Sequence, residues 1–417
     1  MAKHRAILFL VLPSLVLIVG FLFTLIPSKL ATLHATAAST ASQANWPIYG
    51  FNSHHTNANP FETTISKSNA SHLTVKWQVT HSNAHWSSPV LINNVLYIVD
   101  GNILYALNAT SGKKVWSVNL VNTYRGFTPA VVNNVVYAMG NQHLLALNAT
   151  TGKQIWSHPF TSYVGVSPLV VNNVVYMGSS DENMYAFNAQ TGAMLWKYMV
   201  STPGDTVLFA TPTYGNGVLY VEASIGFTSV NNMYTLNATT GILIWMVKLD
   251  DGGGAIPYNP TLVSGVVYYM SVTTLQNGNC SEAKVGALQS ASGQSKWANL
   301  YGYCSNGAFA YSNGILYFGL ADLNDPYSYA YALNASDGTT KWQYRVLSSN
   351  QLSYLASTPA IANGIAYLAL SDNNFYAFDA QIGTILWQYT TDLFAGPPIV
   401  INGMVYAPAS TLYAFGL

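Results

Sequence analysis

Five carboxylate residues are the first candidates for chemistry, because carboxylate oxygens are the ligands that a hard cation such as calcium takes in proteins. They are Asp205, Glu222, Asp250, Asp251 and Asp322. We expect them to be scattered among inserted loops of a repetitive chain. The pattern therefore favours solvated loop charges, and we assign no catalytic, cofactor-binding or metal-ligating residue.

Histidines form a second candidate group, since imidazoles from neighbouring loops can hold zinc or copper. The candidates are the pair His54-His55 together with His81 and His85. Strand residues four apart share a face but lie about 13 Å apart along it, so His81 and His85 need a curled loop to converge. We expect no ligation by these histidines. The sequence also lacks a CxxCH motif for haem attachment.

Two further groups have structural explanations. Arg125 lies in the predicted loop between the first two repeats; we expect it to bind backbone carbonyls, with anion binding as the alternative. Asn108, Asn148, Asn237 and Asn334 lie in N-A-T/S sequences that match glycosylation acceptors. All four occupy the same predicted turn, where an Asn side chain hydrogen-bonds its own backbone, so turn chemistry explains them.

A repeated hairpin must position all of these residues. In LALNATTGKQIW (Leu145–Trp156), an alternating strand leads into a turn at Asn148 and Gly152, and Trp156 lies on the returning strand. The variants are YALNATSGKKVW, YAFNAQTGAMLW, YTLNATTGILIW, GALQSASGQSKW, YALNASDGTTKW and YAFDAQIGTILW. A Trp can bury about 150–250 Å² against the next sheet. We therefore assign the docking of neighbouring sheets to Trp77, Trp116, Trp156, Trp196, Trp245, Trp297, Trp342 and Trp387.

Each repeat divides into four predicted strands. An apolar segment that begins with proline meets a two-residue turn, as at Asn93-Asn94, and an aromatic-bearing strand and the hairpin follow. Later repeats carry Asn313-Gly314, Asn363-Gly364 and Asn402-Gly403 at the same place, and Asn-Gly is the preferred pair for a tight hairpin turn. We expect no helix in the chain after residue 27.

The spacing of the tryptophans predicts an eight-bladed propeller. From Trp77 onward the separations are 39, 40, 40, 49, 52, 45 and 45 residues, the length of one four-stranded blade. Residues 397–417 supply three strands and end before a Trp strand, whereas the strand Leu73–Val79 around Trp77 has no preceding turn. Pairing the two ends closes the ring and leaves no open sheet edge.

The recurring pattern A-x-N/D-x-x-T/S-G-x-x-x-W resembles the pyrroloquinoline-quinone (PQQ) repeat family over residues 46–417. The start WPIYG and the NxxxLxxxW strand are similar to the openings of quinoprotein dehydrogenases and of the outer-membrane assembly propeller BamB. In the dehydrogenases, the resemblance implies calcium, an Asp base, an aromatic platform for the quinone and an adjacent Cys pair. This chain has no adjacent cysteines, and where an acidic residue is frequent in those enzymes it has His85-Trp86-Ser87-Ser88-Pro89.

Composition and the N-terminus indicate a location outside the cytoplasm. Only 7% of the 417 residues are charged, 15 basic against 15 acidic, so no basic field for nucleic acid exists. Lys3 and Arg5 precede an uncharged run over residues 6–26, which is long enough to span a bilayer. We favour a retained anchor; a cleaved signal peptide with Ala35-Thr36-Ala37 at the cleavage site is the alternative.

The predicted organisation is a signal-anchor or signal peptide at 1–27, a flexible linker at 28–44, an N-terminal arm at 45–72 and the propeller at 73–417. We expect Cys280 and Cys304 to form a disulfide, because both predicted loops emerge on one face of an exported chain.

The leading hypothesis is a monomeric, non-catalytic scaffold that binds a protein or glycan partner and needs no cofactor. The alternative is a PQQ- and calcium-dependent dehydrogenase of alcohols or sugars.

Overall fold

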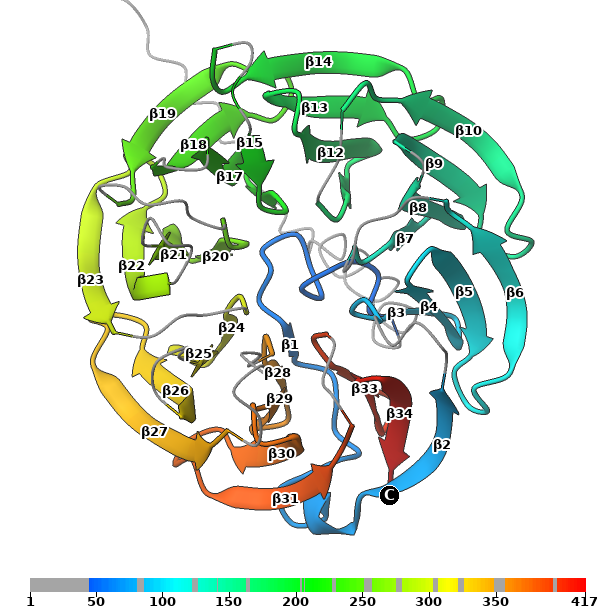
Figure 1. The fold of residues 1–417 in the computed structure, drawn as a ribbon, viewed down its shortest axis with the longest axis vertical. Helices are drawn as coiled ribbons and strands as arrows, with labels where there is room; N and C mark the ends of the chain where they lie inside the picture. Colours follow the sequence, from blue (N-terminus) through cyan, green and yellow to red (C-terminus); the bar gives the residue numbers. More distant parts are fainter. Residues whose placement is uncertain are drawn as a thin grey trace, which may run out of the picture. The chain divides into compact units, whose positions relative to one another are not determined.

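The repeated hairpin determines the architecture, which we describe from a computed structural model. The structure describes residues 45–80, 86–121, 127–140, 142–162, 166–202, 205, 207–226, 230–250, 257–274, 280–302, 307–321, 326–348, 357–392 and 396–417. Eight sheets of four or five strands surround a common axis, as the tryptophan spacing predicts, and their strands are antiparallel except where β1 of the arm pairs with β28 (Figure 1).

The blades follow one another along the chain, and each blade begins at its innermost strand. The first four contain β3 (Val90–Ile92), β4 (Val95–Asp100), β5 (Ile103–Asn108), β6 (Lys114–Asn119); β7 (Ala130–Val132), β8 (Val135–Gly140), β9 (His143–Asn148), β10 (Gln154–Pro159); β11 (Leu169–Val171), β12 (Val174–Ser179), β13 (Asn183–Asn188), β14 (Met194–Met199); and β15 (Val207–Phe209), β16 (Thr213–Gly215), β17 (Val218–Ile225), β18 (Asn231–Asn237), β19 (Leu243–Lys248).

The last four blades contain β20 (Thr261–Val263), β21 (Val266–Thr274), β22 (Cys280–Gln289), β23 (Ser295–Tyr301); β24 (Ala310–Ser312), β25 (Ile315–Ala321), β26 (Tyr327–Asn334), β27 (Thr340–Leu347); β28 (Ala360–Ala362), β29 (Ile365–Ala369), β30 (Asn374–Asp379), β31 (Ile385–Thr390); and β32 (Ile399–Ile401), β33 (Met404–Pro408), β34 (Thr411–Gly416), β2 (Thr74–Thr80). The arm adds the two-residue strand β1 (Ala58–Asn59) and the 3-10 helix η1 (Ala70–His72). The expectation of no helix was therefore wrong for this single turn, where backbone N–H groups within residues 66–73 donate to carbonyls three or four residues earlier.

Neighbouring blades are joined by one recurring contact. In the second blade, Trp156 Nε1 and the Tyr137 hydroxyl both donate to the carbonyl of Ala189 in the third blade, each at 3.0 Å. Gly192 of the same turn has φ +72°, and a Cβ on it would lie 2.7 Å from the Trp156 ring. Glycine is thus required both for the turn conformation and for the approach of the indole. The predicted docking role of the tryptophans agrees with this geometry.

The ring closes as predicted, with the N-terminal strand in the last blade. β2 pairs with β34, and Trp77 Nε1 donates to the carbonyl of Ala109 in the first blade at 2.9 Å. Tyr406 of β33 donates to the same carbonyl at 3.1 Å, so the composite blade docks like the others. The strand covers Thr74–Thr80, one residue later than Leu73–Val79.

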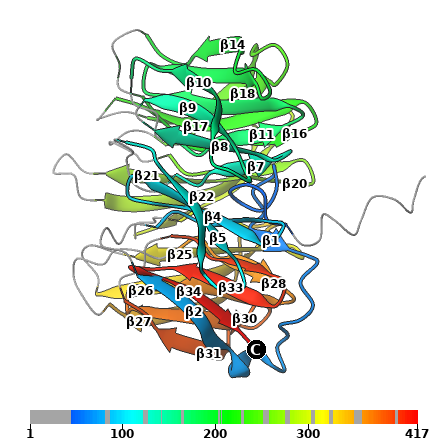
Figure 2. The same ribbon diagram turned by 90° about the vertical axis from the view of Figure 1, so that its right-hand side faces the viewer.

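The arm crosses one end of the axis and contacts the blades in chain order (Figures 1 and 2). In each of these blades, the arm bonds to the middle residue of the innermost strand. The backbone pairs are Trp46 with Leu91, Pro47 with Val131, Ser53 with Tyr214, His54 with Leu262, Thr56 with Tyr311 and Asn57 with Ile361. In the third blade Ile48 shares a core cluster with Val170, and in the eighth Asn59 Nδ2 donates to the Val400 carbonyl at 2.9 Å.

The two faces of the ring differ. On the arm face, the two-residue turns have residues with positive φ, as at Asn133-Asn134. The opposite face, called the loop face, is where each outer strand and each second strand of the described residues ends. The predicted anchor and linker, residues 1–44, lie outside the described residues. Within the part that the structure describes, no helix is long and apolar enough to cross a membrane.

Candidate functional site

A buried carboxylate marks the strongest candidate site. In every blade, the second strand carries a Tyr whose partner on the third strand is Ala, except in blade four, where Tyr220 faces Thr235. Two residues after this Tyr the other blades have Val99, Met139, Gly178, Met270, Gly319, Ala369 and Pro408. Blade four has Glu222, which is fully buried. Glu222 and Thr235 therefore break the repeat at one place.

These side chains lie in the interface between blades four and five. Tyr220 donates to the Ser290 carbonyl of blade five, and strand alternation places Glu222 and Thr235 on the same face of the sheet as Tyr220. Asn231 lies on this face as well and is also fully buried. Asn231 Oδ1 and Thr235 Oγ1 have no hydrogen-bond partner, and the polar group facing the Glu222 carboxylate is the backbone amide of Tyr258.

Blade five is adapted at the same place. Tyr269 lies in the core cluster shared with Tyr220 and is paired with Gly286, at which a Cβ would lie 2.5 Å from the Tyr269 ring. Gly286 stands where other blades carry large residues such as Tyr234 or Tyr331. The missing side chain thus creates the space that the Tyr269 ring fills beside the carboxylates.

Asp250, the second residue after β19, completes the cluster. Its carboxylate accepts a hydrogen bond from the Asn231 backbone N–H at 3.2 Å and another from the Ser271 hydroxyl. Asn231 Nδ2 donates to Ser271 Oγ at 3.0 Å, so strands from two blades share one polar network. Nearby, Lys284 Nζ donates to the Leu249 carbonyl at 2.8 Å.

Burial controls the electrostatics of this cluster. It raises the pKa of Glu222 well above its ordinary value; the backbone amide of Tyr258 opposes this shift, and the charge of Asp250 adds to it. Burial, together with the charges of Glu222 and Asp250, raises the pKa of Tyr269 to about 12. Two carboxylates in a dry interface therefore need a proton or a cation.

The sequence-based view of the carboxylates was wrong for two of them. Glu222 lies on strand β17 and not in an inserted loop, and its pKa responds to the charge of Asp250. The cause is strand pairing, which brings the two positions to one interface. Asp205 is separate and accepts a hydrogen bond from Thr202 at 3.0 Å. Asp251 and Asp322 lie outside the described residues.

The described histidines have structural roles. His55 is fully buried, its Nδ1 lies 2.9 Å from Thr213 Oγ1, and burial lowers its pKa to about 3. Burial also lowers the pKa of His54. Among the described residues, no three His, Cys, Asp or Glu side chains form a metal-binding group.

Four further predicted residues cannot be compared with the structure. His81, His85, Arg125 and Cys304 lie outside the described residues, as does the side chain of Cys280. The disulfide therefore stays a prediction.

Asn108, Asn148 and Asn237 make the expected turn contacts through their side-chain oxygens, whereas Asn334 differs and donates its Nδ2 to the Thr339 hydroxyl. Asn148 Oδ1, for example, accepts hydrogen bonds from the backbone N–H groups of Thr150 and Thr151, both at 3.0 Å.

The described residues just before the innermost strands carry no counter-charge for PQQ, a polycarboxylate quinone. They are small and uncharged, and they bond to the adjacent blade: Ser167 Oγ accepts from Thr128 N at 3.0 Å, and Thr358 Oγ1 accepts from Ala308 N at 2.8 Å. No described Lys or Arg lies on an innermost strand. The described residues therefore supply neither counter-charges nor a carboxylate cluster at the axis.

Two surface hollows are features of the repeat. Hollows of about 460 and 550 Å³ lie at the arm face beside Trp156 and between the first two blades, and Tyr137 and Tyr97 occupy the same position in their linings. Since the same groove recurs between successive blades, it indicates no specific ligand.

Comparisons with known proteins agree with this architecture. The sequence matches the family model described as outer membrane protein assembly factor BamB over residues 63–227, 99–272 and 281–414. No curated protein sequence matches the chain significantly.

Similar solved structures include quinohemoprotein alcohol dehydrogenase from Comamonas testosteroni, with TM-score 0.72 and 14% identity over 91% of this chain and 81% of that one. BamB from Moraxella catarrhalis has TM-score 0.60 and 15% identity over 83% of this chain and 98% of its own. Such low identities show the fold alone. The family match covers most of the sequence, and the chain therefore belongs to the PQQ-repeat β-propeller family that includes BamB.

Proposed function

We propose that this protein is an extracytoplasmic, non-catalytic platform that binds a protein partner on its loop face. The difference between the two faces carries this proposal. The arm covers the axis on one face with backbone hydrogen bonds, whereas the opposite face carries the connections that vary in length, such as 226–230 and 101–102. Variable loops on a rigid scaffold are where binding residues concentrate.

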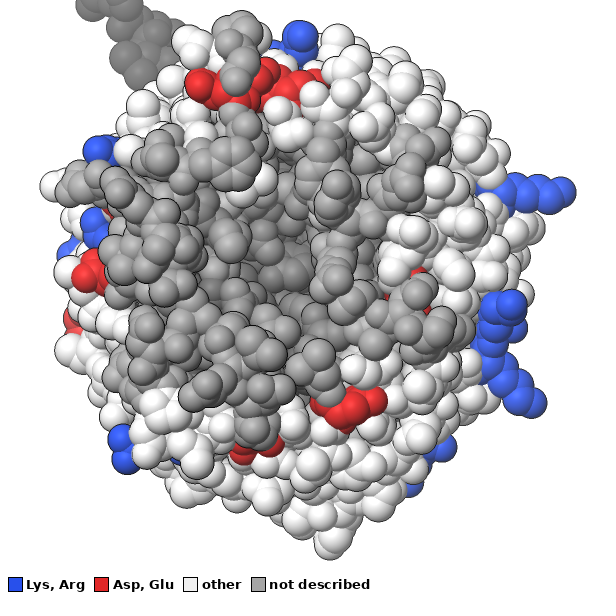
Figure 3. Space-filling model, viewed as in Figure 1, with Lys and Arg blue, Asp and Glu red and all other residues white. Residues whose placement is uncertain are grey.

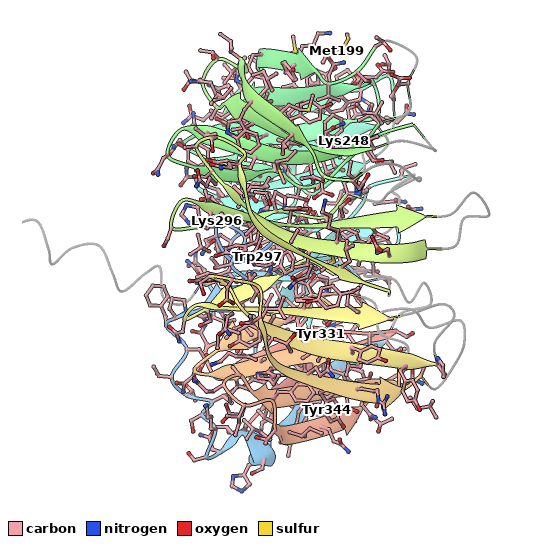
Figure 4. All side chains as sticks on the ribbon, turned by 90° about the vertical axis from the view of Figure 1, so that its left-hand side faces the viewer. Met199, Lys248, Lys296, Trp297, Tyr331 and Tyr344 are labelled. Carbon is pink, nitrogen blue, oxygen red and sulfur yellow. The ribbon has the colours of Figure 1, made fainter. Side chains whose placement is uncertain are left out.

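The chemistry of the loop face favours a protein partner. Apolar side chains stay exposed where outer strands reach this face, including Met199 at 45%, Leu300 at 62% and Leu347 at 61%. Figure 4 shows Met199 and Lys248 on β14 and β19. Figure 3 looks onto the loop face, where Lys and Arg gather at the outer edge and Asp and Glu form separate spots. Apolar contacts with a sparse charged rim are typical of protein interfaces.

The second candidate is a PQQ- and calcium-dependent dehydrogenase of alcohols or sugars. It is favoured by the structural likeness to quinohemoprotein alcohol dehydrogenase and opposed by the uncharged residues before the innermost strands.

One experiment separates the two functions. A photo-crosslinking residue is placed at Met199 or Leu300, and at Ile155, which begins the outer strand of blade two and is 51% exposed, as the control. The platform predicts one adduct of the same mass from both loop-face positions and none from Ile155. Purified protein is also titrated with PQQ and calcium and assayed for dye-linked oxidation of alcohols and sugars. Turnover, or equal crosslinking from Ile155, would overturn the proposal.

A further inference from the structure

Two neighbouring outer strands make part of the propeller's outer edge apolar. They are β14 of blade three and β19 of blade four (Figure 1). Six large apolar side chains on or beside these strands are exposed, and we call them the rim surface: Met194, Leu195, Ile242, Leu243, Ile244 and Met246. The two strands' contributions adjoin, because Trp196 Nε1 donates to the Ala238 carbonyl at 3.0 Å and Gly241 of the same turn lies against the Trp196 ring.

We propose that the rim surface binds a second copy of the same chain, with the two β19 strands antiparallel about a two-fold axis. β19 is the last strand of its sheet, so its outer edge has no strand partner among the described residues. Proteins normally place charged side chains on such edges, because an unprotected edge associates with other copies of the same chain. Blade four lacks this protection, and the occupant that the protection normally excludes is therefore the one expected here.

Comparison of the outer strands shows what blade four lacks. Residues 242–247, ILIWMV, contain no charged or amide side chain, whereas the same six positions of every other blade contain at least one Lys or Gln. Lys296 and Lys341, for example, stand where blade four has Ile244. Every outer strand also has a bulge beside its Trp. The side chains, and not the backbone, therefore set blade four apart.

The exposed row on β19 is complementary to itself. Trp245 and Val247 pack toward blade five, which leaves Ile244 and Met246 exposed with Lys248 at the end of the row. With the two-fold axis at Trp245, Ile244 faces Met246 of the second copy, and Lys248 faces Ile242 of the second copy. The two lysines are thus kept apart. A two-fold contact requires a surface that matches itself, and it closes after two copies.

The size of the rim surface fits a small dimer interface. Its six side chains, about half exposed on average, offer on the order of 300 Å² of apolar surface per copy. A standard interface buries about 800 Å² per partner, a little over half of it apolar. The six side chains therefore supply most of the apolar part, and we expect a dimer that dissociates in the micromolar range. This proposal departs from the monomer expected from the sequence.

The test measures the mass of full-length protein by sedimentation at increasing concentration. We expect a reversible change from one chain to two. Ile244→Lys should raise the dissociation constant by at least about tenfold, because it places an unpaired charge in the contact. The variant should fold, since blades five and six already carry Lys at this position. Ile155→Lys, at the same position of blade two and 51% exposed against 49% for Ile244, is the matched control and should leave the dimer unchanged.

A second pair of variants tests the antiparallel arrangement. Ile242→Glu and Ile242→Lys remove the same side chain, but the first places a carboxylate and the second a cation opposite Lys248 of the second copy. Within one chain, positions 242 and 248 lie about 20 Å apart along the strand, so only the dimer brings them together. Ile242→Lys should therefore dimerise at least about fivefold more weakly than Ile242→Glu.

Four results would overturn the proposal. Wild type could remain a single chain up to about 100 µM, where an interface of this size should form. Ile244→Lys could dimerise as tightly as wild type, or Ile155→Lys could weaken the dimer as much as Ile244→Lys does. The two Ile242 variants could dimerise equally. Finally, a photo-crosslinking residue at Met246 could label lipid or a different protein instead of a second copy, which would assign the rim surface to that occupant.

Discussion

Acid should destabilise the propeller through His55, which lies in the arm beneath the axis. Thr213 Oγ1 bonds both to His55 Nδ1 and to the Pro260 carbonyl. Since the carbonyl can only accept, the hydroxyl donates to it, and Nδ1–H must donate to the hydroxyl. Nε2 is left as a bare lone pair, buried and without a partner. The structure thus accommodates neutral imidazole and opposes the charged form.

The size of the effect follows from linkage. Burial lowers the pKa of His55 from 6.5 to about 3, so below pH 6.5 the unfolded chain binds a proton that the folded chain excludes. Stability contributed by this group is complete above pH 6.5 and is lost as pH falls toward 3. At about 1.4 kcal/mol per pH unit, moving to pH 4.5 should cost roughly 2–3 kcal/mol.

The assay is urea unfolding of full-length wild type and His55→Asn at pH 7 and pH 4.5. Asn can place an amide N–H where Nδ1 lies but does not titrate. The variant loses packing against Tyr49, whose ring centre lies 5.4 Å from the imidazole, and this loss is the same at both pH values. His72→Asn, in the exposed 3-10 helix, is the matched control.

Wild type should lose roughly 2–3 kcal/mol more than His55→Asn between the two pH values, and His72→Asn should behave as wild type. An equal loss in wild type and His55→Asn would refute the reasoning, because the acid sensitivity would then come from other groups.

Three more results are expected. Deleting residues 1–44 should leave the melting temperature nearly unchanged. Deleting residues 1–80 should abolish cooperative melting in calorimetry, because it also removes β2 from the last blade. Equal melting of the two shortened proteins would contradict ring closure. At Gly241 an added Cβ would lie 2.6 Å from an atom of the Trp196 indole, whereas at Gly217, which has a similar φ, it would meet open space. Gly241→Ala should therefore destabilise the folded protein by about 1–3 kcal/mol more than Gly217→Ala does. Equal stability of the two variants in chemical denaturation would argue against the docking contact. The Cys280–Cys304 pair should resist alkylation until reduced, as mass spectrometry can detect, and labelling of both thiols before reduction would exclude the bond.

The eight blades could be predicted from sequence because their contacts are local and repeated. Trp156 and Gly192 lie one repeat apart, and the same pair recurs around the ring, so the period of the sequence and that of the structure agree. The closing strand could also be predicted. The first Trp strand has no preceding turn and the last repeat has no Trp strand, so pairing the first strand with the last repeat completes both.

The candidate site could not be predicted, because it depends on register between distant strands. Glu222 and Asp250 are 28 positions apart, and only strand pairing within blade four and the packing of blade five bring them together. A signal was nevertheless present: comparing the repeats position by position isolates Glu222 and Thr235 as the residues that break the rule. The path of the arm left no such signal, because backbone atoms make most of its contacts.

The length of the arm also matches the number of blades. Its residues meet the innermost strands in strict order, from Trp46 at the first blade to Asn59 at the eighth. Propellers can gain or lose a blade by duplication or loss of one repeat, since each unit packs only on its neighbours. Here such a change would shift every later blade against a segment of fixed length. A nine-bladed descendant would therefore need a longer arm in the same step, and the arm makes eight the number that this lineage can most easily keep.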